Sequence, residues 1–323
     1  MSNTPVSDPA DHAPISSRGF CYFQRRFMPV EEANINIMTH AFLYGTAVFE
    51  GIRGYSSASD PGRICIFRAE EHFTRLKRSA QVLKMRLPAE MAEMLDLTRQ
   101  LVAHSGYRCD VYLRPLIYKS ALRIGVQLDD QQEFAMFVLP WGRKYPQGAP
   151  GVNVGISSWR RLEDNAIPSR AKINGSYVNI ALGTDEVHAN GLDEPLLLSE
   201  DGHLAEAAGM NVFLVRNGEL ITPGEHSNIL EGITRDSLWR LAEKELGLRV
   251  IGRDVDRSEL YAADEMFLCG TGAEILPVAS VDRRPIGTGQ PGAITCQLMQ
   301  LYGRVVRGEV DAYRHWLLPV VSA

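Results

Sequence analysis

The sequence predicts a mixed α+β protein built from two domains, and three observations support this class. Strand-like runs and amphipathic helical segments follow one another along the 323-residue chain, which is long enough for two domains of ordinary size. The apolar fraction of 45% and the charged fraction of 23% are those of a globular protein. Near the middle, "PWGRKYPQGAPG" (140–151) carries prolines and glycines without any apolar period and predicts a connection between domains.

These features divide the chain into four parts. We expect a loose polar tail at residues 1–19, an N-terminal α/β domain at 20–139, an interdomain linker at 140–150 and a C-terminal domain at 151–323.

Elements of the N-terminal domain follow from hydrophobic periodicity. "GFCYFQRRFMPV" (19–30) predicts a pair of strands, and residues 39–44 a short helix that gives way at Gly45 to a β-rich run. "RICIF" (63–67) predicts a strand that ends at Arg68. In the next segment, apolar residues recur at helical spacing and predict an amphipathic helix over 69–85. The domain continues with a helix at about 89–105 and strands at 110–120 and 133–141.

The C-terminal domain begins with a strand at 152–161 and a helix at about 175–189. "NVFLVRNGELITP" (211–223) predicts a hairpin that turns at Asn217-Gly218. "ITRDSLWRLAEKELG" predicts a helix that ends at Gly247, a residue common after the last helical turn. The remaining expected elements are strands at 194–200 and 265–271, a hairpin at 275–287 and a final helix at 292–307.

Charge and patterning argue against several classes of function. The net charge of -5 and the absence of a Lys/Arg run argue against nucleic acid as the main partner. No apolar stretch approaches the roughly 20 residues that span a bilayer. The polar N-terminal segment lacks an apolar core typical of a secretion signal, so we expect a cytoplasmic protein. The five cysteines are widely spaced and show no pattern typical of disulfides or zinc sites.

Phosphate-loop, hydrolase and metalloprotease motifs are missing from the sequence, which favours chemistry borrowed from an organic cofactor. Gly232, Ile233 and Thr234 stand at a helix start, where free N–H groups favour a phosphate. Gly270 and Gly272 directly follow an apolar strand and could present backbone donors. An ordinary helix start and an ordinary turn explain the same patterns.

Two charged residues stand in unexpected surroundings. Lys172 is one of six lysines among 34 basic residues, and it lies beside Ala171 and ahead of Gly175 and Ser176, small residues that would let a ligand approach. If buried, its amine could lose its proton and act as a Schiff-base nucleophile. Glu206, within "LAEAAGMN", would need a cationic partner such as a pyridinium nitrogen. The plainer alternatives are a solvated surface lysine and a helix-cap or loop acid.

Five motifs together carry a resemblance to a known family. "YGTAVFEGIR", "YLRPLIY", "AKINGSYVN", "LEGITRD" and "GTGAEILPV" stand in this order along the chain. From about Phe20 to Gly308 the sequence closely resembles the branched-chain amino acid aminotransferases, which are class IV (fold type IV) pyridoxal-phosphate enzymes. The resemblance implies a smaller N-terminal α/β sandwich and a larger C-terminal pseudo-barrel domain that binds pyridoxal 5'-phosphate.

The resemblance also implies roles for single residues. Lys172 would bind the cofactor covalently and then move the proton between the substrate α-carbon and the cofactor. Tyr177 would hydrogen-bond the phenolic oxygen of the cofactor, and Glu206 would keep its ring nitrogen protonated. The phosphate would be held by Arg68, Ile233, Thr234 and Thr271.

For the substrate, Tyr112 with the amides of Thr271 and Gly272 would bind the α-carboxylate. Phe49, Tyr44 and Tyr177 would form an apolar side-chain pocket with Arg114 near its far end. Because side chains alternate between the two faces of a β-strand, Tyr112 and Arg114 lie on the same face. Arg114 could therefore bind the distal carboxylate of 2-oxoglutarate.

The predicted function is therefore transfer of an amino group between L-branched-chain amino acids and 2-oxoglutarate by a ping-pong route, in a homodimer or larger assembly. The same scaffold could instead serve as a D-amino acid or (R)-amine transaminase or an aminodeoxychorismate lyase, or as a non-catalytic binding protein. The family often has "SEGxGEN" where this chain has "AEAAGMN", and Arg123 lies in a loop that the family uses to cover the substrate.

Overall fold

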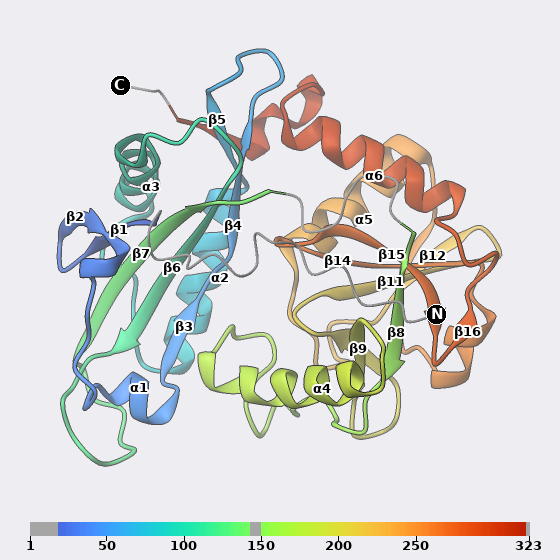
Figure 1. The fold of residues 1–323 in the computed structure, drawn as a ribbon, viewed down its shortest axis with the longest axis horizontal. Helices are drawn as coiled ribbons and strands as arrows, with labels where there is room; N and C mark the ends of the chain where they lie inside the picture. Colours follow the sequence, from blue (N-terminus) through green and yellow to red (C-terminus); the bar gives the residue numbers. More distant parts are fainter. Residues whose placement is uncertain (1–18, 143–149, 321–323) are drawn as a thin grey trace.

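The structure is a computed structural model that describes residues 19–142 and 150–320. Two β-sheets lie side by side, each with helices packed against it (Figure 1). This arrangement confirms the predicted α+β class. Most of the expected linker at 140–150, and the expected tail apart from Gly19, lie outside the described residues.

The first sheet contains mainly strands from the first half of the chain. Its strands are β1 (Phe20–Phe23), β2 (Arg26–Pro29), β3 (Ala47–Phe49), β4 (Ile52–Ser56), β5 (Ile64–Phe67), β6 (Val111–Lys119), β7 (Gln132–Pro140) and β17 (Leu317–Pro319). Their order is β17-β5-β4-β6-β7-β1-β2, and β3 pairs with β6. The long antiparallel pair of β6 and β7 forms the centre of this sheet and holds Tyr112 opposite Leu139 and Arg114 opposite Phe137.

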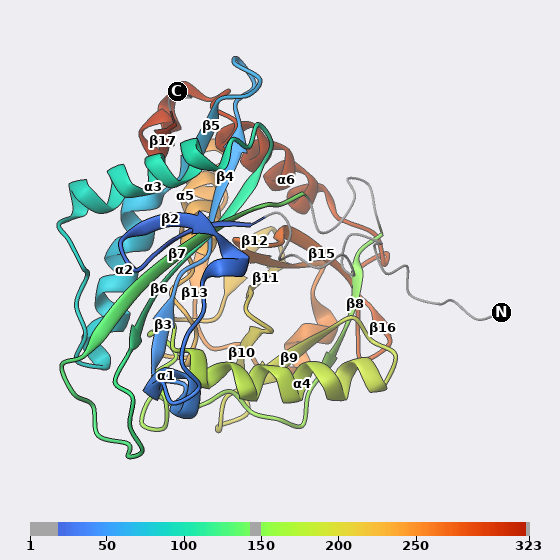
Figure 2. The same cartoon turned by 60° about the vertical axis from the view of Figure 1, so that its left-hand side comes forward.

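Three helices accompany the first sheet: α1 (His40–Tyr44), α2 (Ala69–Val82) and α3 (Met91–Ser105). The periodicity expected for α2 is confirmed, because Phe73, Leu76 and Ala80 are fully buried in a core shared with Ile66 and Leu113 of the sheet. α3 packs beside α2 on the same side (Figure 2). Burial of this apolar face, more than helix propensity, stabilises both helices.

The second sheet curls around the apolar core of the other half of the molecule. Its strands are β8 (Val152–Ile156), β9 (Glu194–Leu198), β10 (Leu204–Ala207), β11 (Asn211–Arg216), β12 (Glu219–Thr222), β13 (Val250–Gly252), β14 (Glu265–Gly270), β15 (Glu274–Val281) and β16 (Arg284–Pro285). The order is β10-β9-β8-β15-β14-β11-β12-β13, with β16 on β15.

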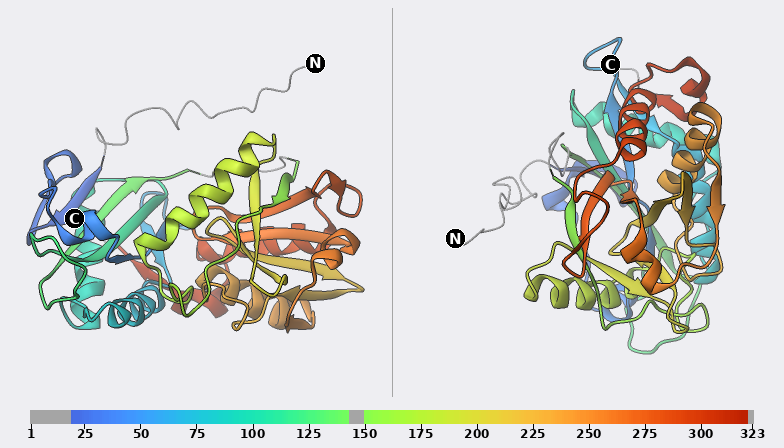
Figure 3. Two further views of the ribbon diagram at one scale, coloured as in Figure 1. Left: turned by 90° about the horizontal axis from the view of Figure 1, so that it is seen from below. Right: turned by 90° about the vertical axis from the view of Figure 1, so that its right-hand side faces the viewer.

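Helices α4 (Tyr177–Ala189), α5 (Ile233–Leu246) and α6 (Ala293–Val306) pack on this second sheet. α5 and α6 contact each other and β14, whereas α4 lies along β8 and β9 (Figure 3). Short 3-10 helices lie at Val30–Glu32, Asn174–Ser176, Arg257–Ala262 and Asp311–Trp316. The turn at Asn217-Gly218 and the end of α5 at Gly247 are confirmed, and both glycines have positive φ.

Two features differ from the expectation. The strand expected at 152–161 ends at Ile156. Beyond it, two backbone amides bond to side chains and not to a neighbouring strand: the Ser158 amide donates to the Glu186 carboxylate, and the Trp159 amide donates to the Ser157 hydroxyl. In addition, β17 near the end of the chain pairs with β5 of the first sheet. This strand lies in the first sheet, although the sequence assigned its residues to the C-terminal domain. The domain boundaries inferred from the sequence stay a prediction. Within residues 19–142 and 150–320, no helix is long and apolar enough to cross a membrane.

Candidate active site

A cavity of about 570 Å³ lies where the two sheets meet. The first half of the chain supplies its wall from β3, β6, β7 and α2, and the second half supplies it from the segment before α4, from β10 and from the loops before α5 and after β14. The lining side chains are predominantly apolar with a small group of charged residues, the composition typical of a small-molecule site.

Lys172 lies half-buried in this cavity between the two sheets. Its Nζ donates to the Tyr177 hydroxyl at 2.6 Å and lies 4.9 Å from the centre of the Phe49 ring. Its backbone is held from the other half of the molecule, because its amide donates to Ser79 Oγ and its carbonyl accepts the Phe49 amide. The amine is therefore fixed at the junction of the two sheets.

Glu206 is a buried acid on strand β10, and neither a helix cap nor a loop residue. Its Oε1 pairs with Arg161 Nη2 at 2.9 Å, and its Oε2 accepts hydrogen bonds from the Leu230 amide at 3.0 Å and Asn211 Nδ2 at 3.3 Å. Burial raises the pKa of the Glu206 carboxyl, while Arg161 and the Leu230 amide act against that rise. The Arg161 Nε and Nη1 atoms are buried and have no partner among the described residues.

Arg75 on α2 reaches the cavity from a buried charge cluster. Its Nε and Nη2 hold the two oxygens of Glu50, each at 2.7 Å, and its Nη1 donates to the Glu231 carbonyl at 2.7 Å. His72 Nδ1 also lies 2.7 Å from Glu50. Burial alone would raise the pKa of Glu50, but Arg75 and His72 outweigh it and hold the pKa at about 2. The cluster thus links α2 to the residue just before the N-terminus of α5.

Backbone donors enter the cavity at two places. Ile233 and Thr234 form the first turn of α5, whose leading N–H groups have no partner within the helix. Thr271 and Gly272 lie in the short loop between β14 and β15. Both places favour negatively charged groups, the first also through the helix dipole.

The opposite wall carries Tyr112 and Arg114, which alternation along β6 places on one face as expected. Arg114 Nη2 donates to the Tyr112 hydroxyl at 2.7 Å, and its guanidinium stacks over the Phe49 ring at 4.6 Å. Arg114 Nε has no partner among the described residues. Gly51 leaves the room for Tyr112, because a Cβ there would lie 2.3 Å from the tyrosine hydroxyl.

Ten of the twelve residues to which the resemblance gave a role line the cavity together: Phe49, Tyr112, Arg114, Lys172, Tyr177, Glu206, Ile233, Thr234, Thr271 and Gly272. Their separate roles stay proposals. Gly175 does not line the cavity; it packs instead against Gly45, to whose carbonyl it donates a backbone hydrogen bond.

Arg68 does not reach the cavity, and its expected contact with a phosphate does not fit this structure. Its backbone is left-handed at the start of α2 (φ 48°), and its Nη1 donates to Asp236 at 2.6 Å and to Ser237 at 2.9 Å. Nε donates to Glu71. Arg68 therefore stabilises the first turns of α5 from the side away from the cavity.

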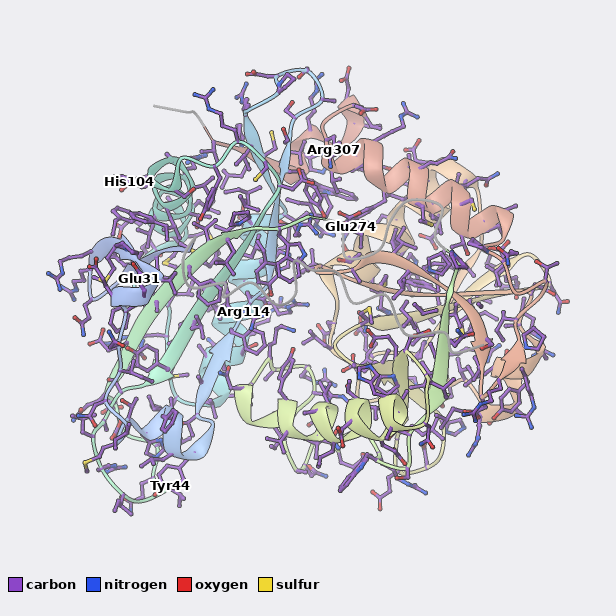
Figure 4. All side chains as sticks on the ribbon, viewed as in Figure 1. Glu31, Tyr44, His104, Arg114, Glu274 and Arg307 are labelled. Carbon is purple, nitrogen blue, oxygen red and sulfur yellow. The ribbon has the colours of Figure 1, made fainter. Side chains whose placement is uncertain are left out.

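Tyr44 is likewise outside the cavity wall. Its hydroxyl accepts the Gly125 amide at 3.0 Å at an exposed position. Figure 4 shows Tyr44 at the far end of the first half of the molecule, well separated from Arg114. Arg123 also stays within its own loop, where it bonds to the Gln127 carbonyl and pairs with Asp129.

Four further residues line the cavity that the sequence did not single out: Arg75, Arg161, Asn211 and Trp141. A signal for Arg75 exists, because it falls on the buried face of α2 between His72 and Ser79, where an unpaired charge would be costly. The other three follow strand ends or turns, and no local pattern distinguishes them.

The comparisons with known proteins agree with this geometry. The family model for class IV amino-transferases matches residues 47–281. A probable branched-chain-amino-acid aminotransferase of Aquifex aeolicus is 44% identical over 305 residues, which is 94% of this chain and 97% of that protein. The branched-chain amino acid aminotransferase of Thermobaculum terrenum, solved in its PLP form, superposes with a TM-score of 0.88 at 40% identity and covers 94% of this chain and 98% of that one.

Another solved branched-chain amino acid aminotransferase, from the organism abbreviated T.th., is also similar. Its complex with N-(5'-phosphopyridoxyl)-L-glutamate superposes with a TM-score of 0.86 at 40% identity over 93% of this chain and 98% of that chain. The same protein has been solved with pyridoxamine 5'-phosphate and with 4-methylvaleric acid. Full-length identity at this level, together with the shared fold, shows that the present chain belongs to the class IV aminotransferases, among the branched-chain amino acid aminotransferases.

Proposed function

We propose that this protein transfers the amino group between L-leucine, L-isoleucine or L-valine and 2-oxoglutarate, with pyridoxal 5'-phosphate as its cofactor. The observation that carries the proposal is the lysine amine held 2.6 Å from Tyr177 in a cavity that also contains buried Glu206 and the N-terminus of α5. These groups match the reactive amine, the acid and the phosphate seat that such a cofactor needs.

The charges of the cavity fit this cofactor. Arg75 and the first turn of α5 offer a cation and free N–H groups to a phosphate, and Glu206 offers a carboxylate to a protonated ring nitrogen. The tie from Arg75 to the Glu231 carbonyl holds these two parts of the phosphate seat together. We assign to Arg75 the phosphate contact that the sequence had suggested for Arg68.

Bound pyridoxal phosphate supplies an electron sink that makes the bonds at the substrate α-carbon easier to break. Lys172 Nζ would hold the cofactor and would move the proton at the substrate α-carbon. Tyr177 orients this amine through its hydroxyl. Glu206 is held by its pair with Arg161 and by its bond from the Leu230 amide, so its carboxyl group would face the ring nitrogen and favour a proton there.

The two substrates differ in their side chains, and one cavity must accept both. Phe49 and Tyr177 form an apolar wall for a branched aliphatic chain; their ring centres are 5.0 Å apart. Arg114, stacked on Phe49, offers a cation to the distal carboxylate of 2-oxoglutarate. Tyr112 with the amides of Thr271 and Gly272 then serves the α-carboxylate common to both substrates.

We further propose that two copies associate through an apolar surface on the first half of the molecule. This surface, the α1 patch, consists of Ile37 just before α1, Phe42 on α1, and Leu122, Ile124 and Val126 in the β6–β7 loop. Ile124 and Ile37 are 84% and 75% exposed. The loop is tied to α1, since the His40 amide donates to the Ala121 carbonyl. An apolar patch of this kind on an enzyme is typical of a subunit interface.

Sedimentation equilibrium tests the assembly. The parent protein should be at least a dimer, and Ile124→Glu should shift it toward the monomer. Val82→Glu, at an exposed apolar residue of α2 outside the patch, should leave the assembly unchanged. A monomeric parent, or equal behaviour of both variants, contradicts the proposal.

The cytoplasmic location expected from the sequence stays a prediction.

Substrate panels test the proposed reaction. With purified, cofactor-loaded protein, L-leucine, L-isoleucine, L-valine and L-glutamate should each convert the cofactor to its amine form in a single turnover. D-alanine and (R)-1-phenylethylamine should react far more slowly. A preference for either of those two compounds would instead assign the protein to a D-amino acid or (R)-amine transaminase.

A further inference from the structure

The loop between β14 and β15 ends in a glutamate where its geometry favours glycine. Gly270 pairs with Glu274 across the end of the hairpin, so that Thr271, Gly272 and Ala273 form a three-residue loop. The φ angle of Glu274 is +61°, in the left-handed region. Three-residue hairpin loops commonly close with a left-handed residue, and glycine adopts that conformation without steric cost.

A buried arginine from the other sheet faces the Glu274 side chain. Arg53 on β4 is 1% exposed, and its Nη2 lies 3.6 Å from Glu274 Oε1 and 3.6 Å from Asp110 Oδ2. Asp110 also pairs with Arg307 at 2.8 Å. Two arginines and two acids therefore form a charge-balanced cluster between the sheets. Figure 4 shows Glu274 and Arg307 at this junction, with Arg114 on the strand below. Removal of one acid would leave a buried positive charge uncompensated.

The same arginine is linked to the cavity wall by a second route. Arg53 Nη2 donates to the Trp141 carbonyl at 3.3 Å, and Trp141 Nε1 donates to the Gly272 carbonyl at 3.4 Å. Arg53 also lies opposite Tyr112 in the pairing of β4 with β6. Arg53 thus connects the loop of one sheet with the strand of the other sheet that carries Tyr112.

We propose that Glu274 is a positioning residue for substrate binding: its ion pair with Arg53 holds the loop Thr271–Ala273 against the first sheet, at the distance from Tyr112 that a substrate carboxylate requires. The backbone cost of a left-handed glutamate is offset by this ion pair, and strain of this kind is typical of functional sites. The inference rests on the proposed function, which assigns the substrate α-carboxylate to Tyr112 and this loop.

Two substitutions separate this role from a contribution to stability alone. Glu274→Gln keeps the left-handed strain and removes the charge. Glu274→Gly removes the side chain but also relieves the strain, so it should melt at a temperature no lower than Glu274→Gln. Asn217→Gly is the matched control, since Asn217 is a left-handed hairpin residue (φ 52°) in a turn remote from the cavity lining.

The experiment measures binding of 4-methylvaleric acid, an unreactive carboxylate with a leucine-like chain, to the cofactor-loaded protein through the cofactor absorbance. Both Glu274 variants should raise its dissociation constant by about tenfold to a hundredfold, the effect expected when a hydrogen bond to the charged carboxylate is lost. They should also raise KM for L-leucine more than they lower kcat. Asn217→Gly should bind as the parent does.

Parent-like binding by Glu274→Gly would overturn the proposal. If only Glu274→Gln lost binding, the loss would come from the glutamine side chain and not from the missing ion pair, and the proposal would also fail. If the parent protein itself fails to bind 4-methylvaleric acid and to react with L-leucine, the proposed function fails instead. The two failures are therefore distinguished before any variant is measured.

Discussion

At the scale of single residues, the proposal that one cavity accepts two unlike substrates rests on how Arg114 is held. Its guanidinium is stacked on Phe49 and donates to Tyr112, so it lies at the edge of the apolar wall and not within it. Nε has no partner among the described residues. A cation in this position can pair with a carboxylate without removing the apolar surface that an aliphatic chain contacts.

Arg114→Ala should therefore impair one half-reaction far more than the other. Loss of a charged hydrogen bond corresponds to roughly a tenfold to hundredfold effect, and we expect this loss for glutamate or 2-oxoglutarate. The L-leucine half-reaction should change much less. Stopped-flow single turnovers with each substrate measure this difference. Equal losses would mean that Arg114 serves the α-carboxylate or has a structural role.

Glu50 predicts a pH dependence of stability. Its pKa in the folded protein is about 2, below the ordinary value of 4.5, since Arg75 and His72 outweigh burial. A lowered folded-state pKa contributes stability that is present above pH 4.5 and is lost as the pH falls toward 2. Urea unfolding of the parent between about pH 6 and pH 3 should therefore show a steeper loss of stability than Glu50→Gln shows.

Glu50→Gln should also be less stable at neutral pH by ~3–5 kcal/mol, because it leaves the buried Arg75 without its charged partner. Parallel pH profiles for the variant and the parent would show that Glu50 is not the titrating group.

At the scale of secondary structure elements, the residue that ends α1 also determines how closely the two halves of the molecule approach each other. α1 ends at Gly45 and α3 at Gly106, both left-handed with φ of 67° and 69°. A Cβ on Gly106 would meet nothing within 4 Å, whereas a Cβ on Gly45 would lie 2.8 Å from the Cα of Gly175. Gly45 therefore permits both the helix end and a backbone contact just after Lys172.

This pair gives a matched test of that contact. Gly106→Ala should cost ~1–2 kcal/mol for the left-handed conformation alone. Gly45→Ala should cost that amount and about 1–3 kcal/mol more for the clash with Gly175, and it should lower kcat because the Lys172 segment shifts. Chemical denaturation and steady-state rates measure both effects. Equal destabilisation by the two substitutions would mean that the backbone yields freely at Gly45.

Local patterns predicted elements better than they predicted the site. The helices α2 and α5 and the hairpin at Asn217-Gly218 could be inferred because their signals, apolar periodicity and turn residues, lie within a few residues of each other. β10, which carries Glu206, could not be inferred as a strand, since "LAEA" is short and rich in alanine. Its extended form depends on pairing with β9.

The misplaced Arg68 has a similar explanation. The sequence places it at a strand end, but the direction of its side chain depends on a left-handed backbone and on Asp236, which is 168 residues away. Arg75 lies two helical turns further along α2 and reaches the cavity instead.

At the scale of the whole molecule, contacts between distant segments of the chain hold together the two halves that form the cavity. β17 returns to β5, Arg307 pairs with Asp110, and the Phe49 amide binds the Lys172 carbonyl. These contacts link residues that are far apart in the sequence, so neither the composition nor the periodicity predicts them. The resemblance to the family indicated which residues belong to the site. The structure shows which of those side chains line one cavity.

The central claim is that Lys172 is the residue to which the cofactor binds covalently, and borohydride reduction tests it most directly. The protein loaded with pyridoxal phosphate is reduced, digested and analysed by mass spectrometry. We expect the cofactor on the peptide that contains Lys172, and no labelled peptide from Lys172→Ala. A label on Lys119, which is buried near the end of β6 and bonded to the carbonyls of Lys84 and Asp129, would contradict this account. So would an unlabelled Lys172 in a protein that retains its cofactor.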